Sequence, residues 1–158
     1  MNPIEKTLSY EGGYSNDPSD PGSETNFGIS KKSYPNVDIA GLTKDQAIAI
    51  YQRDFWTPLL CDQIADKRVA WKLFDIAVNH GTIDAVRMVQ FIVGASIDGI
   101  MGPDTLHKIN CYNPQDLLFE LSEESIKQHI GLVEKNPHLS EFIVGWITRD
   151  LDRGADLV

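Results

Sequence analysis

The sequence predicts a mainly α-helical fold with one short hairpin or irregular loop after the first helix. Apolar residues recur at helical spacing through most of the 158-residue chain. In residues 16–30, NDPSDPGSETNFGIS, turn-forming residues are dense instead, and the alternating piece at 25–29 favours a small hairpin. No repeat or low-complexity tract interrupts the chain, and its length is sufficient for a hydrophobic core.

The first helix is expected to begin at Pro3, because the preceding asparagine can cap it and proline suits the first helical position. The glycine pair at 12–13 would end it. Ile4, Leu8 and Glu11 follow one another at helical intervals, so this helix would place all three on one face. A carboxylate would then lie among side chains that point toward the core.

Further helices are expected where the apolar period resumes: over residues 43–56, with a capping box formed by Thr43 and Gln46, over 66–80, over 82–93, from 103, from 114 and from about 139. The side chains expected to face inward include Tyr51, Ala77, Leu117, Leu118, Leu121, Ser125, Ile130, Phe142 and Trp146. The pattern is weakest between residues 94 and 103. We therefore expect a catalytic region over residues 1–93 and a helical region over 94–158, packed in the same compact domain.

The amino-acid composition of the chain disfavours nucleic acid, membranes and metal ions as partners. The chain carries 14 basic and 23 acidic side chains, a net charge of −9, which disfavours nucleic acid as a partner. No stretch is apolar and long enough to span a bilayer, so membrane insertion is not expected. The four histidines and two cysteines show no metal-ligand spacing, so we expect no metal and no cofactor, and we expect Cys61 and Cys111 to be free thiols.

Glu11 is the most informative residue of the predicted site. Partial burial on an apolar face disfavours the ionised form of a carboxylate, and a general acid must be protonated. The glycine pair leaves room for a bulky ligand, and Tyr14 offers a ring for stacking. The loop that follows adds the carboxylates of Asp17, Asp20 and Glu24. One protonated and one ionised carboxylate are the groups that glycoside hydrolysis uses. A plainer alternative stays open, in which Glu11 faces solvent and the loop carboxylates only cap turns.

The stretch EGGYSNDPSDPGSETNFGIS, residues 11–30, resembles the signature of the glycoside hydrolase family 108 muramidases, lysozyme-like enzymes of phage endolysins and their bacterial relatives. LFDIAVNHGTIDAVRMVQ is similar to the family's F-D-x-A-V-N-x-G block. IDGIMGPDTLHKI and FIVGWITRDL resemble its C-terminal peptidoglycan-binding portion, which ends in G-W-x-x-R. Ser23, Glu24 and Ser30 depart from the usual pattern without touching the glutamate. The resemblance implies a lysozyme-like helical fold and cleavage of the β-1,4 bond between N-acetylmuramic acid and N-acetylglucosamine.

The resemblance makes Glu11 the catalytic acid. Asp20 is our first choice for the second catalytic group, and Thr25 is expected to position the attacking water if Asp20 does not. The predicted substrate-binding side chains are Tyr14, Asn26, Asp75, Asn79 and His80. For His80 the alternative is a charge at a helix C-terminus. For Trp146 with Arg149, we favour a place in the core over stacking on a sugar.

The expected partner is the glycan strand of peptidoglycan, and the protein is expected to be a monomer. The N-terminal residues MNPIEKTLSYEGG lack the pattern of a signal peptide, so we expect synthesis in the host bacterial cytoplasm and export through a phage holin or a secretion system to the periplasmic wall. A phage endolysin fits best. The alternatives are a secreted antibacterial effector with the same activity, a non-catalytic wall-binding or secretion-assisting protein, and a peptidase, which would need catalytic residues that the sequence lacks.

Overall fold

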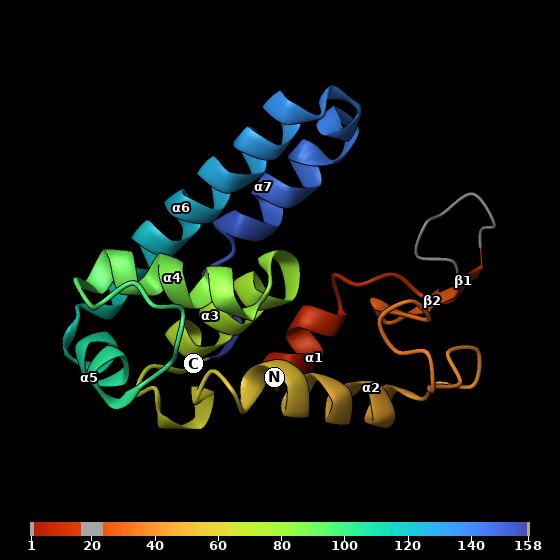
Figure 1. Ribbon diagram of the computed structural model, residues 1–158, viewed down its shortest axis with the longest axis horizontal. Helices are drawn as coiled ribbons and strands as arrows, with labels where there is room; N and C mark the ends of the chain where they lie inside the picture. The colour runs from red at the N-terminus through yellow and green to blue at the C-terminus, as the bar shows by residue number, and fades with distance from the viewer. Residues whose placement is uncertain (1, 17–23, 158) are drawn as a thin grey trace. The chain divides into compact units, whose positions relative to one another are not determined.

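The computed structural model describes residues 2–16 and 24–157, and Figure 1 shows its elements in chain order. The helices are α1 (Pro3–Leu8), α2 (Lys44–Tyr51), α3 (Lys67–His80), α4 (Thr82–Val93), α5 (Pro103–Cys111), α6 (Pro114–Lys135) and α7 (Ile143–Leu151). The strands are β1 (Ser15–Asn16), β2 (Glu24–Asn26) and β3 (Ile29–Ser30). These elements confirm the mainly α fold with a small hairpin after the first helix.

The chain divides into two compact units, Met1–Asp54 and Phe55–Val158. The first holds α1, the three strands and α2, and the second holds α3 to α7. The division falls inside a π-helix, Gln52–Trp56, that continues α2. The boundary predicted after residue 93 lies further along the chain, at the end of α4. Because α4 packs against α3, α5 and α6, the residues on both sides of that position belong to the same compact unit.

Helix α1 starts as predicted but ends early. The Asn2 side chain accepts a hydrogen bond from the backbone N–H of Ile4 at 2.9 Å, as an N-cap should. The helix ends at Leu8 because the Ser9 hydroxyl donates to a carbonyl one turn back and the next N–H makes only a three-residue turn. Glu11 therefore lies in a bend beyond the helix, and the prediction that it shares a helical face with Leu8 is wrong.

The three strands form an antiparallel sheet in the order β1-β2-β3. Thr25 pairs with Ser15 on one side and with Ser30 on the other. Between β2 and β3 lies a two-residue turn, in which Phe27 has a φ of 51° and Gly28 a φ of 74°. Two positive φ angles are what a type I′ hairpin turn requires, and they fit the twist of the paired strands. This turn carries the candidate site.

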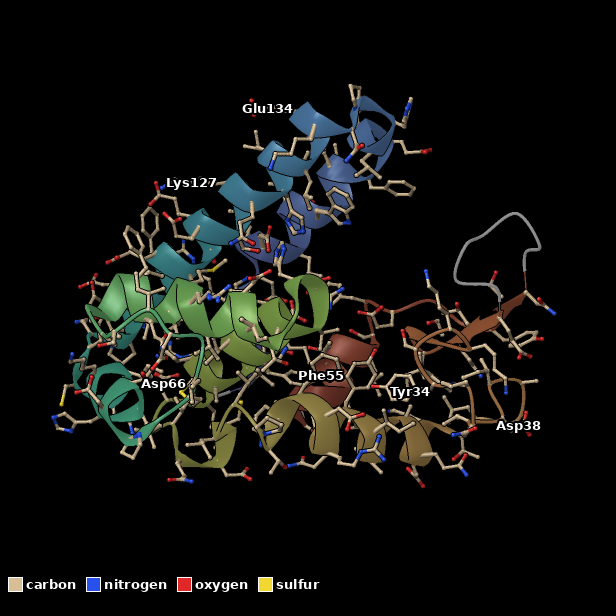
Figure 2. The ribbon with its side chains drawn as sticks, in the orientation of Figure 1. Tyr34, Asp38, Phe55, Asp66, Lys127 and Glu134 are labelled. Carbon is tan, nitrogen blue, oxygen red and sulfur yellow. The ribbon has the colours of Figure 1, made fainter. Side chains whose placement is uncertain are left out.

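The predicted helix signals locate most boundaries of the second unit. The side chain of Asp66, labelled in Figure 2, caps α3 by accepting from two backbone N–H groups. Gly81 ends the helix. Helix α4 ends at Gly94, whose φ is 70°. In Figure 1, α6 and α7 lie side by side, and their contacts bury Ser125 and His129 of α6 and Asp150 of α7.

Two inward-facing predictions for this unit are wrong. Ile130 is 44% exposed, because the long helix α6 extends beyond the elements that cover its N-terminal half. Phe142 is 49% exposed. It ends a 3-10 segment, Pro137–Phe142, that precedes α7, whereas the prediction placed it inside the last helix. Leu117, Leu118, Leu121 and Ser125 of α6 are buried as expected.

Within the described residues, no helix is long and apolar enough to cross a membrane. Cys61 is buried, Cys111 is exposed and both are free thiols, as predicted. Among the same residues, no group of three or more potential metal ligands is gathered at one place.

Candidate active site

The Glu11 carboxyl lies against the turn between β2 and β3. Glu11 is half-buried in the bend after α1. A Cβ atom added to Gly28 would lie 2.6 Å from Oε2 of Glu11 and 2.7 Å from the hydroxyl oxygen of Tyr51. Both distances are shorter than any ordinary van der Waals contact, so the carboxyl and the hydroxyl closely approach the same backbone position. The turn needs glycine at residue 28 both for its positive φ and for this close approach.

The two glycines that follow Glu11 in the sequence are not crowded by the described residues. A Cβ atom added to Gly12 or Gly13 would meet no atom of the described residues within 4 Å. Both glycines are exposed, and their role in leaving room for a bulky ligand stays a prediction. A half-buried carboxyl next to exposed backbone can donate a proton to a bound group.

Tyr51 belongs to the site although the sequence predicted only its inward direction. It is the last residue of α2 and is 3% exposed. Its hydroxyl donates a hydrogen bond to the carbonyl of Phe27 at 2.9 Å. The residue type itself indicated a polar contact, because the hydroxyl of a buried tyrosine needs a hydrogen-bond partner. The sequence did not show that this partner would be the turn beneath Glu11.

The residues predicted around Glu11 have different roles in the sheet. Tyr14 is exposed, and its hydroxyl donates to Oε1 of Glu24 at 3.0 Å; this bond raises the pKa of the tyrosine. Thr25 is half-buried in the central strand, three residues before Gly28 on the same hairpin. Asn26 is buried, and its amide donates to the carbonyl of Ile39 at 3.1 Å, so it secures the following loop. Asp20, like Asp17, lies outside the described residues.

The loop after β3 is fixed to the same unit by a second tyrosine. Tyr34 donates its hydroxyl proton to Oδ2 of Asp54 at 2.9 Å, and burial together with this bond raises its pKa to about 12. Figure 2 labels Tyr34 and Asp38 on this loop. An open hollow of about 330 Å³ lies between the loop and α2, lined partly by Asp38, Leu42 and Ile50. Glu11 does not line this hollow, so the candidate site rests on the contacts at Gly28.

The other predicted binding residues lie in the second unit, where they form structural contacts. Asp75 is 1% exposed and accepts two hydrogen bonds from the Arg149 guanidinium, at 3.0 Å from Nε and 2.9 Å from Nη2. Asn79 is exposed and donates its amide to the backbone carbonyl of Asp75 at 2.9 Å. The aspartate of the F-D-x-A-V-N-x-G block is thus paired with the arginine of the G-W-x-x-R motif.

His80 takes part in a chain of side chains between α3, α6 and α7. Its Nε2 lies 3.0 Å from the Ser125 hydroxyl, which donates to Asp150 at 2.7 Å. The other oxygen of Asp150 lies 2.7 Å from Nδ1 of His129, whose ring stacks on Trp146. Burial lowers the pKa of His80 to about 4, so the ring is neutral at neutral pH.

Lys72 of α3 binds the C-terminal end of α7. It is fully buried, and its ammonium group donates to the carbonyls of Asp150 at 2.6 Å and Asp152 at 3.1 Å. A cation suits the carbonyls at a helix C-terminus, which carry the negative end of the helix dipole. Burial lowers the pKa of this lysine, and the carboxylates nearby act in the opposite direction. Together with the Asp75–Arg149 pair, this contact makes α7 an integral part of the second unit.

A mainly helical chain with a small antiparallel hairpin after its first helix has the fold of a lysozyme-type glycoside hydrolase. The chain belongs to the glycosyl hydrolase 108 family: the family model described as Glycosyl hydrolase 108 matches residues 4–81, and the one described as Predicted Peptidoglycan domain matches residues 84–151. It is therefore a peptidoglycan hydrolase, as predicted, and Glu11, the hairpin and Tyr51 all fall within the hydrolase match.

A solved structure resembles the chain over nearly its whole length. The chain is similar to Brucella abortus SagA, with a TM-score of 0.75 and 26% sequence identity, over 97% of this chain and 94% of the SagA chain. A comparison with curated proteins finds no match. The boundary between the two family matches falls at the start of α4, whereas the ion pair of Asp75 with Arg149 joins residues from both matches within one compact unit.

Proposed function

We propose that the protein is an N-acetylmuramidase that hydrolyses the β-1,4 bond from N-acetylmuramic acid to N-acetylglucosamine, with Glu11 as the general acid. The observation that carries this proposal is the contact of the Glu11 carboxyl with Gly28 beside the exposed backbone of residues 12–13. The carboxyl would protonate the oxygen of the departing sugar while the bond to the anomeric carbon breaks. Its position in a folded turn would keep the proton aimed at that oxygen during the reaction.

The oxocarbenium-like transition state needs a second group. An ionised carboxylate can attack the anomeric carbon itself or hold the water that attacks it, depending on its distance from the acid. We assign this role to Asp20, and we assign Thr25 to positioning the water near the hairpin. Asp20→Asn is then expected to reduce turnover strongly, whereas the matched change Asp17→Asn in the same loop leaves most of it. Equal and small losses in both variants would exclude Asp20 from the chemistry.

Product analysis of digested peptidoglycan tests the bond assignment. The muramidase reaction creates new reducing ends on N-acetylmuramic acid, which borohydride converts to muraminitol. We expect muraminitol to accumulate with digestion, with no increase in free amino groups. New reducing ends on N-acetylglucosamine would mean that the enzyme cuts the other glycosidic bond, and new amino groups would mean that it cuts stem peptides.

We propose that the biological role is host lysis by a phage endolysin, made in the cytoplasm and acting as a monomer on the wall after release. Ile4 and Leu8 of α1 belong to the buried core, so the N-terminal helix is part of the folded enzyme. Expression in a bacterial cytoplasm is expected to cause lysis only when a holin is expressed with it. Lysis without the holin, accompanied by enzyme in the periplasm, would contradict this route.

A further inference from the structure

Tyr51 connects α2 to the turn beneath the Glu11 carboxyl. The tyrosine is buried at the C-terminal end of α2, and its hydroxyl donates to the Phe27 carbonyl at 2.9 Å. Phe27 has a φ of 51°, which is unfavourable for a residue with a side chain. A hydrogen bond from a rigid, buried ring therefore holds the turn where its backbone conformation needs external support.

The same turn sets the position of the carboxyl. A Cβ added to Gly28 would overlap both Oε2 of Glu11 and the hydroxyl of Tyr51. The backbone of Gly28 is thus in close contact with the two side chains at once. Any movement of the turn away from Tyr51 would remove the surface against which the Glu11 carboxyl is packed.

We propose that Tyr51 is a positioning residue for the catalytic acid: it fixes the Phe27–Gly28 turn and thereby fixes the carboxyl of Glu11. This inference rests on the proposed function, in which Glu11 donates the proton. The Tyr51 hydroxyl donates its hydrogen bond to the Phe27 carbonyl, so we assign the tyrosine to the turn and the proton transfer to Glu11. Its contribution is to hold the acid at the distance and direction that proton transfer requires, where small displacements cost large factors in rate.

The test compares two tyrosine-to-phenylalanine changes in the same unit. Tyr51→Phe keeps the packed ring and removes the bond to the turn. Tyr34→Phe is the matched control, since it removes the hydroxyl bond to Asp54, at the same 2.9 Å, in the loop after β3. Steady-state kinetics are measured on soluble glycan-strand fragments, and circular dichroism with thermal unfolding verifies that each variant is folded.

We expect Tyr51→Phe to lower kcat by roughly tenfold to a hundredfold with KM changed by less than about twofold, because the variant misplaces the acid without altering substrate contacts. Tyr34→Phe should keep kcat within about twofold of wild type. In a Glu11→Gln background, Tyr51→Phe should cause no further loss, since the residue acts only through the acid. Equal kcat values for the two tyrosine variants, or a further loss in that background, would overturn the proposal. Full activity of Glu11→Gln alone would instead overturn the proposed function on which it rests.

Discussion

Breaking the buried ion pair between Asp75 and Arg149 tests whether Asp75 stabilises the fold or binds substrate. Asp75→Asn removes the negative charge and keeps the size of the side chain. The two side chains are 1% and 12% exposed, so the change leaves the Arg149 guanidinium with little solvent to replace its partner. Breaking a buried pair in this way costs about 3–5 kcal/mol of folding free energy. With an m-value of about 2 kcal/mol/M in urea, the unfolding midpoint should fall by roughly 1.5–2.5 M.

The matched control is Glu123→Gln on α6, which removes one of the two exposed ion pairs of Lys127, the residue labelled in Figure 2. Its effect should stay below about 1 kcal/mol, as for most surface pairs. Replacing both members of the buried pair with Asp75→Asn and Arg149→Met should cost less than the sum of the two single changes. If Asp75→Asn kept the wild-type midpoint but abolished hydrolysis, Asp75 would line the saccharide site as the sequence predicted, and its structural role would be refuted.

Three further predictions concern the hairpin and the histidine chain. Gly28→Ala should reduce hydrolysis at least tenfold and destabilise the fold by about 1–2 kcal/mol, because the new methyl group would overlap Oε2 of Glu11 at a positive φ; wild-type kinetics would contradict the contact. Asn26→Ala should lower the unfolding free energy by roughly 1–3 kcal/mol, since it removes a buried amide that donates to the carbonyls of Ile39 at 3.1 Å and Leu42 at 3.4 Å; an unchanged urea midpoint would contradict this. Because burial lowers the pKa of His80 to about 4, the unfolded chain takes up a proton first as pH falls. The free energy of unfolding should therefore decrease between about pH 6.5 and 4, by at most about 3 kcal/mol. The charged or titratable side chains that also act on the pKa of His80 are His129, Asp150, Asp84 and Arg149. The slope of unfolding free energy against pH should be shallower in His80→Gln, and an identical slope would exclude His80 as its source.

The helix boundaries that the sequence predicted well are those with local signals. Asp66 and Gly81 enclose α3, and Gly94 ends α4, because capping and glycine termination depend on residues within one turn of the helix end. A hairpin was predicted from the alternating piece at residues 25–29, but its turn at Phe27 and Gly28 falls inside that piece, between β2 and β3. Local chemistry also fixed the early end of α1, but it did so through the Ser9 hydroxyl, a weaker signal than the glycine pair that follows.

The residues that the sequence placed least well depend on partners far along the chain. Asp75 lies 74 residues before Arg149, and helical periodicity cannot show that the two charges meet. Tyr51 lies 24 residues after the carbonyl that it binds, so its direction was predictable and its partner was not. Glu11 was identified by its motif, whereas its contact with Gly28 became apparent only once the turn was placed beneath it.

The most direct test of the account is the rate at which Glu11→Gln releases new reducing ends from purified peptidoglycan. Glutamine keeps the shape of the side chain and its packing against Gly28, but it cannot donate a proton as a carboxylic acid does. We predict a loss of at least about 100-fold in the initial rate of muraminitol formation, the low end for a general acid, with an unchanged urea midpoint. A folded Glu11→Gln variant that releases muraminitol at a rate near wild type would contradict the assignment of Glu11 as the catalytic acid.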